Sequence, residues 1–165
     1  MKLLGLILLL ILGAGTAAAQ NSDLGLLIGG ADLATGARFG VQINYAWQIM
    51  ERPAGRLYVE LPLILPVKPR PEQNQPSIFI TPGIRYHFNL SPRVAVYVAA
   101  GAGVVTRVQT GQTSKAFALG AGVDYRLTRR WSLRGDFRNP TTSAKFIYFA
   151  RDNNPSTMFG VALHF

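Results

Sequence analysis

Apolar and polar residues alternate with a period of two along most of this chain. The clearest case is the segment 38–50, where bulky apolar residues occupy every second position: Phe39, Val41, Ile43, Tyr45, Trp47 and Ile49. Most positions between them hold arginine, glycine, glutamine or asparagine. Because successive side chains of a β-strand point to opposite faces, this segment is predicted to be a strand with one apolar and one polar wall.

The same alternation predicts eight strands. Their expected ranges are 23–30, 37–50, 55–65, 77–88, 93–107, 115–127, 131–138 and 157–165. The fold class indicated is all-β: an eight-stranded antiparallel up-and-down barrel occupying residues 20–165.

The composition of the two faces indicates which face is inside. One face carries leucine, isoleucine, valine, phenylalanine and tryptophan, and the other carries glycine, alanine and charged residues. The interior of an eight-stranded barrel is only just wide enough for side chains. We therefore expect Ile43, Val98 and Leu163 to face lipid, and Arg126 and Asp136 to face the lumen, as in transmembrane barrels.

The connections between the predicted strands alternate in length. Three are tight: 51–54, 89–92 and 128–130. The others are longer or more polar: 31–36, 66–76, 108–114 and 139–156. Short periplasmic turns and longer external loops are typical of outer-membrane barrels.

The N-terminal segment indicates export. Lys2 precedes the apolar run Leu3–Leu12, and Ala17-Ala18-Ala19 resembles a cleavage site, so residues 1–19 are predicted to be a signal peptide. The chain has no cysteine, which excludes disulfides and thiolate chemistry.

Aromatic residues gather near the short-turn ends of the predicted strands. Those on the apolar face are expected to form an interfacial girdle: Tyr45, Trp47, Tyr86, Phe88, Tyr125, Trp131 and Phe165.

These residues resemble the small outer-membrane β-barrel proteins of the OmpA/OmpX-like superfamily. The resemblance rests on the signal peptide, on Gly120–Leu127 and Trp131–Phe137 as a late hairpin, and on the terminal strand. It implies an outer-membrane location in a Gram-negative envelope. It also implies that Phe159, Val161, Leu163 and Phe165 form a C-terminal signal read by the barrel-assembly machinery.

Charged residues on the polar face are the candidate lumen network. They are Arg56, Glu60, Arg85, Asp124, Arg126, Arg134, Asp136 and Arg138. Charges in a narrow lumen must pair, so we expect a structural salt-bridge core rather than a channel or ligand cavity.

No cofactor, metal or nucleic-acid site is expected from the sequence. Basic residues outnumber acidic ones, 17 against 8, and several fall in or beside the predicted external loops: Lys68, Arg70, Arg107, Lys115, Lys145 and Arg151. Outer-membrane lipid and phosphorylated lipopolysaccharide are the expected partners of a monomeric barrel.

The expected function is a structural or surface-interaction role in the cell envelope, without catalysis. Two alternatives remain. A soluble exported barrel carrying a hydrophobic ligand would have its apolar face inward. A lipid A-modifying enzyme would need serine, histidine and an acid in contact. His87 and His164 are both expected inside, near the periplasmic end, but the His-x-Ser pattern of lipid A deacylase barrels is absent.

Overall fold

The computed structural model describes residues 21–32, 37–66, 77–107, 111–141 and 155–165. The predicted signal peptide, most of the longer loops, and the basic residues Lys68, Arg70, Lys145 and Arg151 lie outside the described residues. Within the described residues, no helix is long and apolar enough to cross a membrane.

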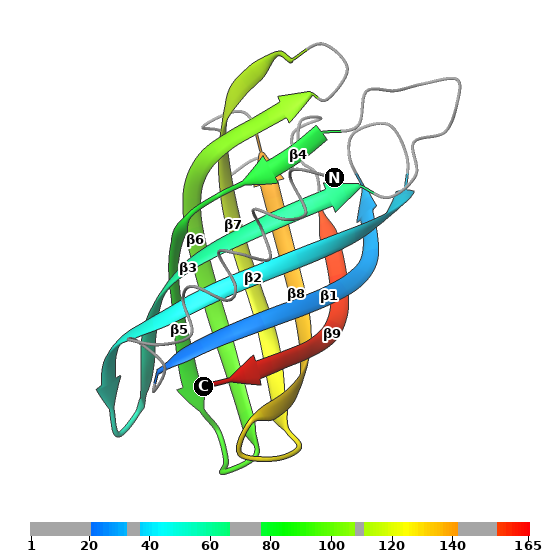
Figure 1. Cartoon of the computed structure of the whole chain (residues 1–165). Helices are drawn as coiled ribbons and strands as arrows, with labels where there is room; N and C mark the ends of the chain where they lie inside the picture. The colour runs from blue at the N-terminus through cyan, green and yellow to red at the C-terminus, as the bar shows by residue number, and fades with distance from the viewer. Residues whose placement is uncertain (1–20, 33–36, 67–76, 108–110, 142–154) are drawn as a thin grey trace.

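The described strands form one closed antiparallel barrel (Figure 1). Their bounds are β1 Ser22–Asp32, β2 Ala37–Arg52, β3 Gly55–Pro66, β4 Ser77–Ile80, β5 Gly83–Asn89, β6 Val94–Arg107, β7 Thr113–Arg126, β8 Trp131–Thr141 and β9 Ser156–His164. The ring closes because β1 pairs with both β2 and β9.

Strands β4 and β5 together fill one position of the barrel. Each pairs with β3 on one side and with β6 on the other, so the barrel has eight strand positions. The single strand expected over 77–88 is interrupted at Thr81 and Pro82, because proline has no N–H to donate to the sheet. Backbone groups at this interruption still form two hydrogen bonds to the neighbouring strands, from Thr81 N to Pro62 O (3.4 Å) and from Ala102 N to Pro82 O (3.0 Å).

Several strands also end at different residues from those predicted. Strand β7 begins at Thr113 and β8 continues to Thr141, so parts of the expected loops 108–114 and 139–156 are strand. Likewise Pro66, expected in a loop, ends β3.

The tight turns lie together at one end of the barrel, the lower end in Figure 1. Two of them contain the same kind of hydrogen bond, in which a side-chain hydroxyl accepts from a backbone N–H three residues later. Ser91 Oγ accepts from Val94 N (3.0 Å), and Thr128 Oγ1 accepts from Trp131 N (3.1 Å). These bonds fix short reversals of the chain at this rim. We call the end of the barrel that holds the three tight turns the short-turn mouth.

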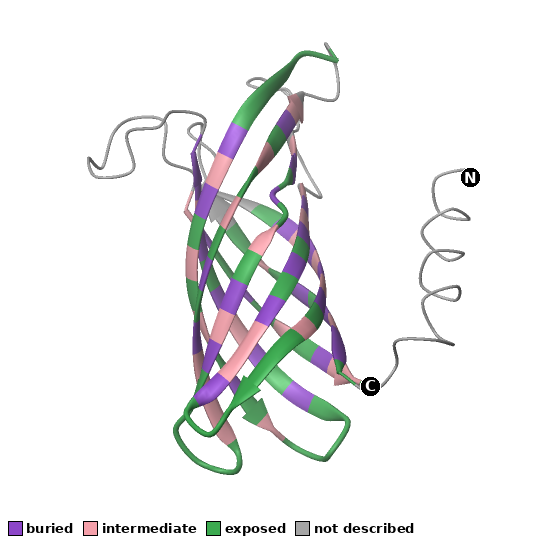
Figure 2. Cartoon of the chain, turned by 90° about the vertical axis from the view of Figure 1, so that its left-hand side faces the viewer, coloured by how far each residue is buried: buried purple, intermediate pink, exposed green. Residues whose placement is uncertain are grey.

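Exposure alternates along the strands, as Figure 2 shows. Val98 is 51% exposed on the outer surface, whereas Asp136 is 2% exposed inside. The bulky apolar face therefore points outward, which confirms the predicted orientation. It also contradicts the soluble-carrier alternative, whose large apolar residues would have to fill the interior.

Candidate functional site in the barrel lumen

A layer of buried ion pairs fills the lumen on the side of the short-turn mouth. Strand β8 supplies three inward charged residues, Arg134, Asp136 and Arg138, which share one face because they are two positions apart. The facing charges come from four other strands. They are Asp23 on β1, Glu60 on β3, Arg85 on β5 and Asp124 on β7.

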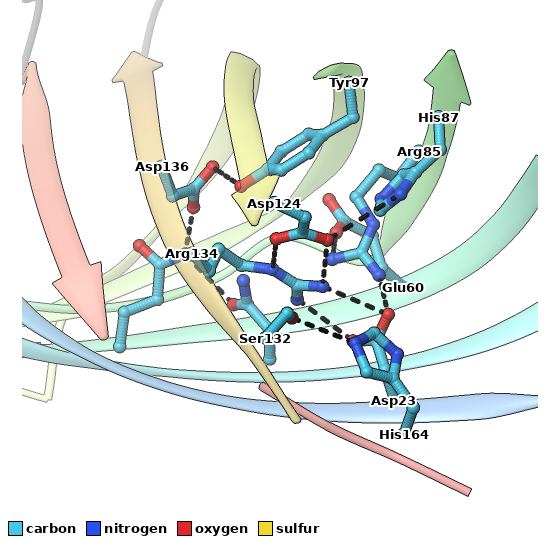
Figure 3. Close-up of polar contacts among 12 residues, drawn as sticks. Asp23, Glu60, Arg85, His87, Tyr97, Asp124, Ser132, Arg134, Asp136 and His164 are labelled. Atoms are coloured by element: carbon cyan, nitrogen blue, oxygen red, sulfur yellow. Dashed lines mark hydrogen bonds and ion pairs between the residues drawn. The ribbon is translucent and has the colours of Figure 1, made fainter. Parts of the chain in front are cut away.

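Arg134 lies at the centre of this layer (Figure 3). Its Nε and Nη2 atoms donate to the two oxygens of Asp124 (2.7 and 2.8 Å). Its Nη1 and Nη2 atoms also donate to Asp23 (3.0 and 3.2 Å), whose carboxylate binds Arg85 as well. One planar guanidinium thus joins carboxylates from β1 and β7, a geometry that lysine does not offer.

A second branch of the layer centres on Arg138. Its guanidinium makes a bidentate pair with Glu60 (2.6 and 3.0 Å), and its Nε donates to Asp136 (2.7 Å). The carboxylate of Asp136 also accepts bonds from the Tyr97 hydroxyl (2.8 Å) and from Gln42. Charges removed from water are tolerated only when they are paired and hydrogen-bonded in this way.

Aromatic rings border the guanidinium groups. The Arg85 guanidinium lies 5.0 Å from the ring centroid of Tyr58 and 5.3 Å from that of Tyr97. Arg134 lies 5.7 Å from the Tyr97 centroid. At these distances the ring faces attract the cations, so Tyr97 contributes both its ring and its hydroxyl to the layer.

Towards the long-loop end the interior holds a cluster of apolar side chains. Six strands each contribute a buried side chain to one cluster: Leu27, Ile64, Phe79, Val105, Ala116 and Met158. The alternation predicted only small or charged residues inside, so this apolar layer corrects that prediction. The lumen is therefore filled by two layers of different chemistry.

The structure places six of the predicted lumen charges in the buried network: Glu60, Arg85, Asp124, Arg134, Asp136 and Arg138. Arg56 is not among them, because it pairs with Glu51 at the mouth (Nε to Oε1, 3.3 Å). Arg126 also lines the mouth and forms no ion pair among the described residues. Sequence reasoning missed Asp23, which is fully buried and binds two arginines.

The two histidines lie next to this network on the mouth side. His87 is stacked on Tyr97 (centroids 5.0 Å apart), and its Nδ1 lies 3.7 Å from Asp124. His164 Nε2 lies 2.9 Å from Ser132 Oγ. Within the described residues, no group of three or more histidine, aspartate or glutamate side chains is arranged to hold a metal ion.

The predicted girdle residues lie on the outer surface near the short-turn mouth. Trp47, Phe88, Tyr125, Trp131 and Phe165 are exposed, while Tyr45 and Tyr86 are partly covered by neighbours. Of the predicted assembly signal, Phe159, Val161 and Leu163 share one face of β9, and Phe165 follows the end of the strand. Phe159, Val161 and Phe165 are exposed. Their role in assembly stays a prediction.

A family model described as the outer membrane protein beta-barrel domain matches residues 4–165. The chain belongs to this family. Its location is therefore the outer membrane, and the short-turn mouth is the periplasmic end, because outer-membrane barrels have short periplasmic turns. No curated protein matches the sequence significantly.

Solved structures support the family's fold in this chain. Neisserial surface protein A aligns at 18% identity over 87% of this chain and 96% of its own, with a TM-score of 0.60. The N-terminal barrel of Pseudomonas aeruginosa OprF aligns at 16% identity, over 88% and 98%, with a TM-score of 0.61. The outer membrane enzyme PagL aligns at 15% identity, over 87% and 99%, with a TM-score of 0.55. At such identities the likeness concerns the fold alone.

Proposed function

We propose that this outer-membrane barrel acts as a non-enzymatic structural or surface-interaction protein of the Gram-negative envelope. The observation that carries the proposal is the buried ion-pair layer, in which seven charged side chains from five strands bind one another across the lumen. A lumen occupied in this way leaves the outer surface and the external loops as the parts that meet other molecules.

The expected partners fit this role. Lipid contacts the exposed apolar belt, and lipopolysaccharide phosphates are the anions nearest to the basic external loops. The structural neighbour from Neisseria is itself described as a surface protein. We expect the chain to act as a monomer, inserted by the barrel-assembly machinery.

Two measurements test the proposal. In planar bilayers, the purified barrel is expected to give no stepwise conductance, whereas an Arg134→Ala/Arg138→Ala variant that remains folded is expected to leak. In cells, deletion of the chain is expected to raise sensitivity to bile salts or large antibiotics without changing lipid A. Steady single-channel currents from the unmodified barrel would contradict a closed lumen.

A lipid A-modifying enzyme is the second candidate, favoured by the contact between Ser132 and His164 and by the fold shared with PagL. Hydrolysis would require an acid to orient the histidine. Asp23 is the partner of His164 in the β1–β9 register, but its carboxylate is bound by Arg85 and Arg134. Ser132 also lies at the periplasmic end of the barrel, away from the external surface, which argues against a role in modifying lipid A there.

Mass spectrometry of lipid A distinguishes the two candidates. Cells expressing the chain, its Ser132→Ala variant, or neither are expected to have the same lipid A. A modification that appears with the unmodified chain and disappears with Ser132→Ala would establish the enzyme.

A further inference from the structure

Two adjoining cavities open at the short-turn mouth. The first has a volume of about 210 Å³ and the second about 280 Å³, and both are lined by Arg56, Tyr58, Arg126 and His164. One water molecule takes up about 30 Å³ in the liquid. The mouth therefore has room for a small polar group together with several waters.

Positive charge exceeds negative charge around these cavities. Arg93 lines the first, Arg129 lines the second and Arg126 lines both. Among the described residues, no carboxylate lies within 4.0 Å of a guanidinium nitrogen of any of these three. The two side-chain carboxylates that line the cavities are already paired: Glu51 binds Arg56, and Asp124 binds Arg134.

A residue that lines the first cavity has a buried nitrogen without a partner. His87 is 5% exposed and lines this cavity, and its Nε2 atom has no hydrogen-bond partner among the described residues. Its ring is held between Tyr58 and Tyr97, with centroids 4.9 and 5.0 Å away. A buried polar atom left unpaired is costly, so this position favours a bound group that hydrogen-bonds to the imidazole.

We propose that the short-turn mouth is a binding site for a phosphate group that enters from the periplasm. A phosphate monoester carries about −1.5 to −2 charge at pH 7 and accepts several hydrogen bonds, which suits a site with several unpaired guanidinium groups better than a carboxylate does. Arg126 and Arg129 bind the phosphate oxygens, and the imidazoles of His87 and His164 contact it from the barrel side. This site is separate from the external surface invoked in the proposed function.

The histidine side chains of the protein can report on binding at this site. It has two histidines, and both line the first cavity. With isotope-labelled histidine in the full chain, refolded in uncharged detergent micelles, the imidazole resonances are therefore observed at the site itself. Inorganic phosphate added near neutral pH should move both sets of resonances saturably, with a dissociation constant on the order of 1 mM. Chloride at matched ionic strength and acetate serve as control anions.

Two adjacent arginines give a matched pair of variants. Arg129→Gln removes a lining charge, whereas Arg130→Gln removes one from the same turn that lines neither cavity. We expect Arg126→Gln and Arg129→Gln each to weaken phosphate binding roughly tenfold, and Arg130→Gln to leave it unchanged. All three residues are outside the buried network, so each variant is expected to fold. A difference in gel mobility between unboiled and boiled samples checks this.

The outcomes separate clearly. Tighter binding of glycerol phosphate than of inorganic phosphate would identify an organic phosphomonoester, and equal binding would identify free phosphate. Resonances that do not move with phosphate, that move equally with acetate, or that respond unchanged in Arg126→Gln would overturn the proposal.

Discussion

Arg138 on β8 binds Glu60 on β3 through both carboxylate oxygens, and these two strands lie on opposite sides of the barrel. Going round the ring in either direction, they are four positions apart. The pair therefore spans the full width of the lumen and holds opposite walls together. Asp136 and Arg85, which contact its two members, extend the link to both sides.

This pair should be strongly coupled in free energy of unfolding. Arg138→Gln leaves Asp136 without its guanidinium partner, and we expect a loss of about 3–5 kcal/mol, because an uncompensated buried charge remains. In a double-mutant cycle, Glu60→Gln with Arg138→Gln should show a coupling of about 1–3 kcal/mol. Urea unfolding of the barrel in micelles, followed by tryptophan fluorescence, measures both.

The rim pair Glu51–Arg56 is the matched control for that cycle. Its side chains are 63% and 24% exposed, so Glu51→Gln with Arg56→Gln should couple by about 1 kcal/mol or less. Equal coupling in the buried and rim pairs would show that the lumen is hydrated enough to screen its charges.

Gly122 makes room for the ring of Tyr97. A Cβ at this position would overlap the Tyr97 ring and hydroxyl and the carbonyl oxygen of Gly135. Gly122→Ala should therefore destabilise the barrel by about 1–3 kcal/mol. Gly135→Ala should have little effect, because its Cβ would make ordinary contacts with Phe159 at 3.4 Å and Val123 at 3.5 Å. The same urea assay checks this, and equal effects would argue against the close packing of Tyr97.

An arginine on the lipid-facing side should impair assembly more strongly the closer it lies to the middle of the membrane. Val161 lies in the middle of β9 and is exposed, so Val161→Arg should cost about 2–4 kcal/mol and reduce the amount inserted in the outer membrane. Thr157→Arg, on the same face near the start of the strand, should cost about 0–1 kcal/mol. Membrane fractionation with heat-modifiable gel mobility compares them; equal insertion would mean that β9 is not in contact with lipid.

The girdle can be located by its two tryptophans. Trp47 and Trp131 are the tryptophans of this chain, and both are exposed near the short-turn mouth. Lipids brominated near the headgroup should quench their fluorescence more than lipids brominated at the chain end, because the rings belong at the interface. Trp47→Phe isolates the signal of Trp131. Stronger quenching from the chain ends would place the girdle at the membrane centre.

The alternation was sufficient to predict the barrel and the outward direction of its bulky residues, since every strand has one surface against lipid. It also predicted that Arg134, Asp136 and Arg138 share a face. It could not predict partners, because these depend on the register of strands distant in sequence. Asp23 was missed because it lies at the very start of β1, before any alternation is established.

The apolar interior layer was hidden for a related reason. Leu27, Ile64 and Phe79 each lie between two outward-facing apolar residues, so the alternation is locally replaced by a run of three apolar residues. Such a run gives no sign of which residue points inward. The break at Thr81 and Pro82 was equally difficult to predict, because the proline lies within an otherwise regular strand pattern.

The orientation of the strand faces is the central claim, and neighbouring cysteines on β6 test it most directly. The natural chain has no cysteine, so Val98→Cys and Ala99→Cys each introduce one thiol, at positions that are 51% and 7% exposed. In lipid bilayers, a spin label on Cys at position 98 should be relaxed by oxygen dissolved in the lipid and not by a water-soluble nickel complex. The thiol at position 99 should resist labelling until the barrel is unfolded. A label at position 98 shielded from oxygen, together with ready contact between lipid and position 99, would contradict the account.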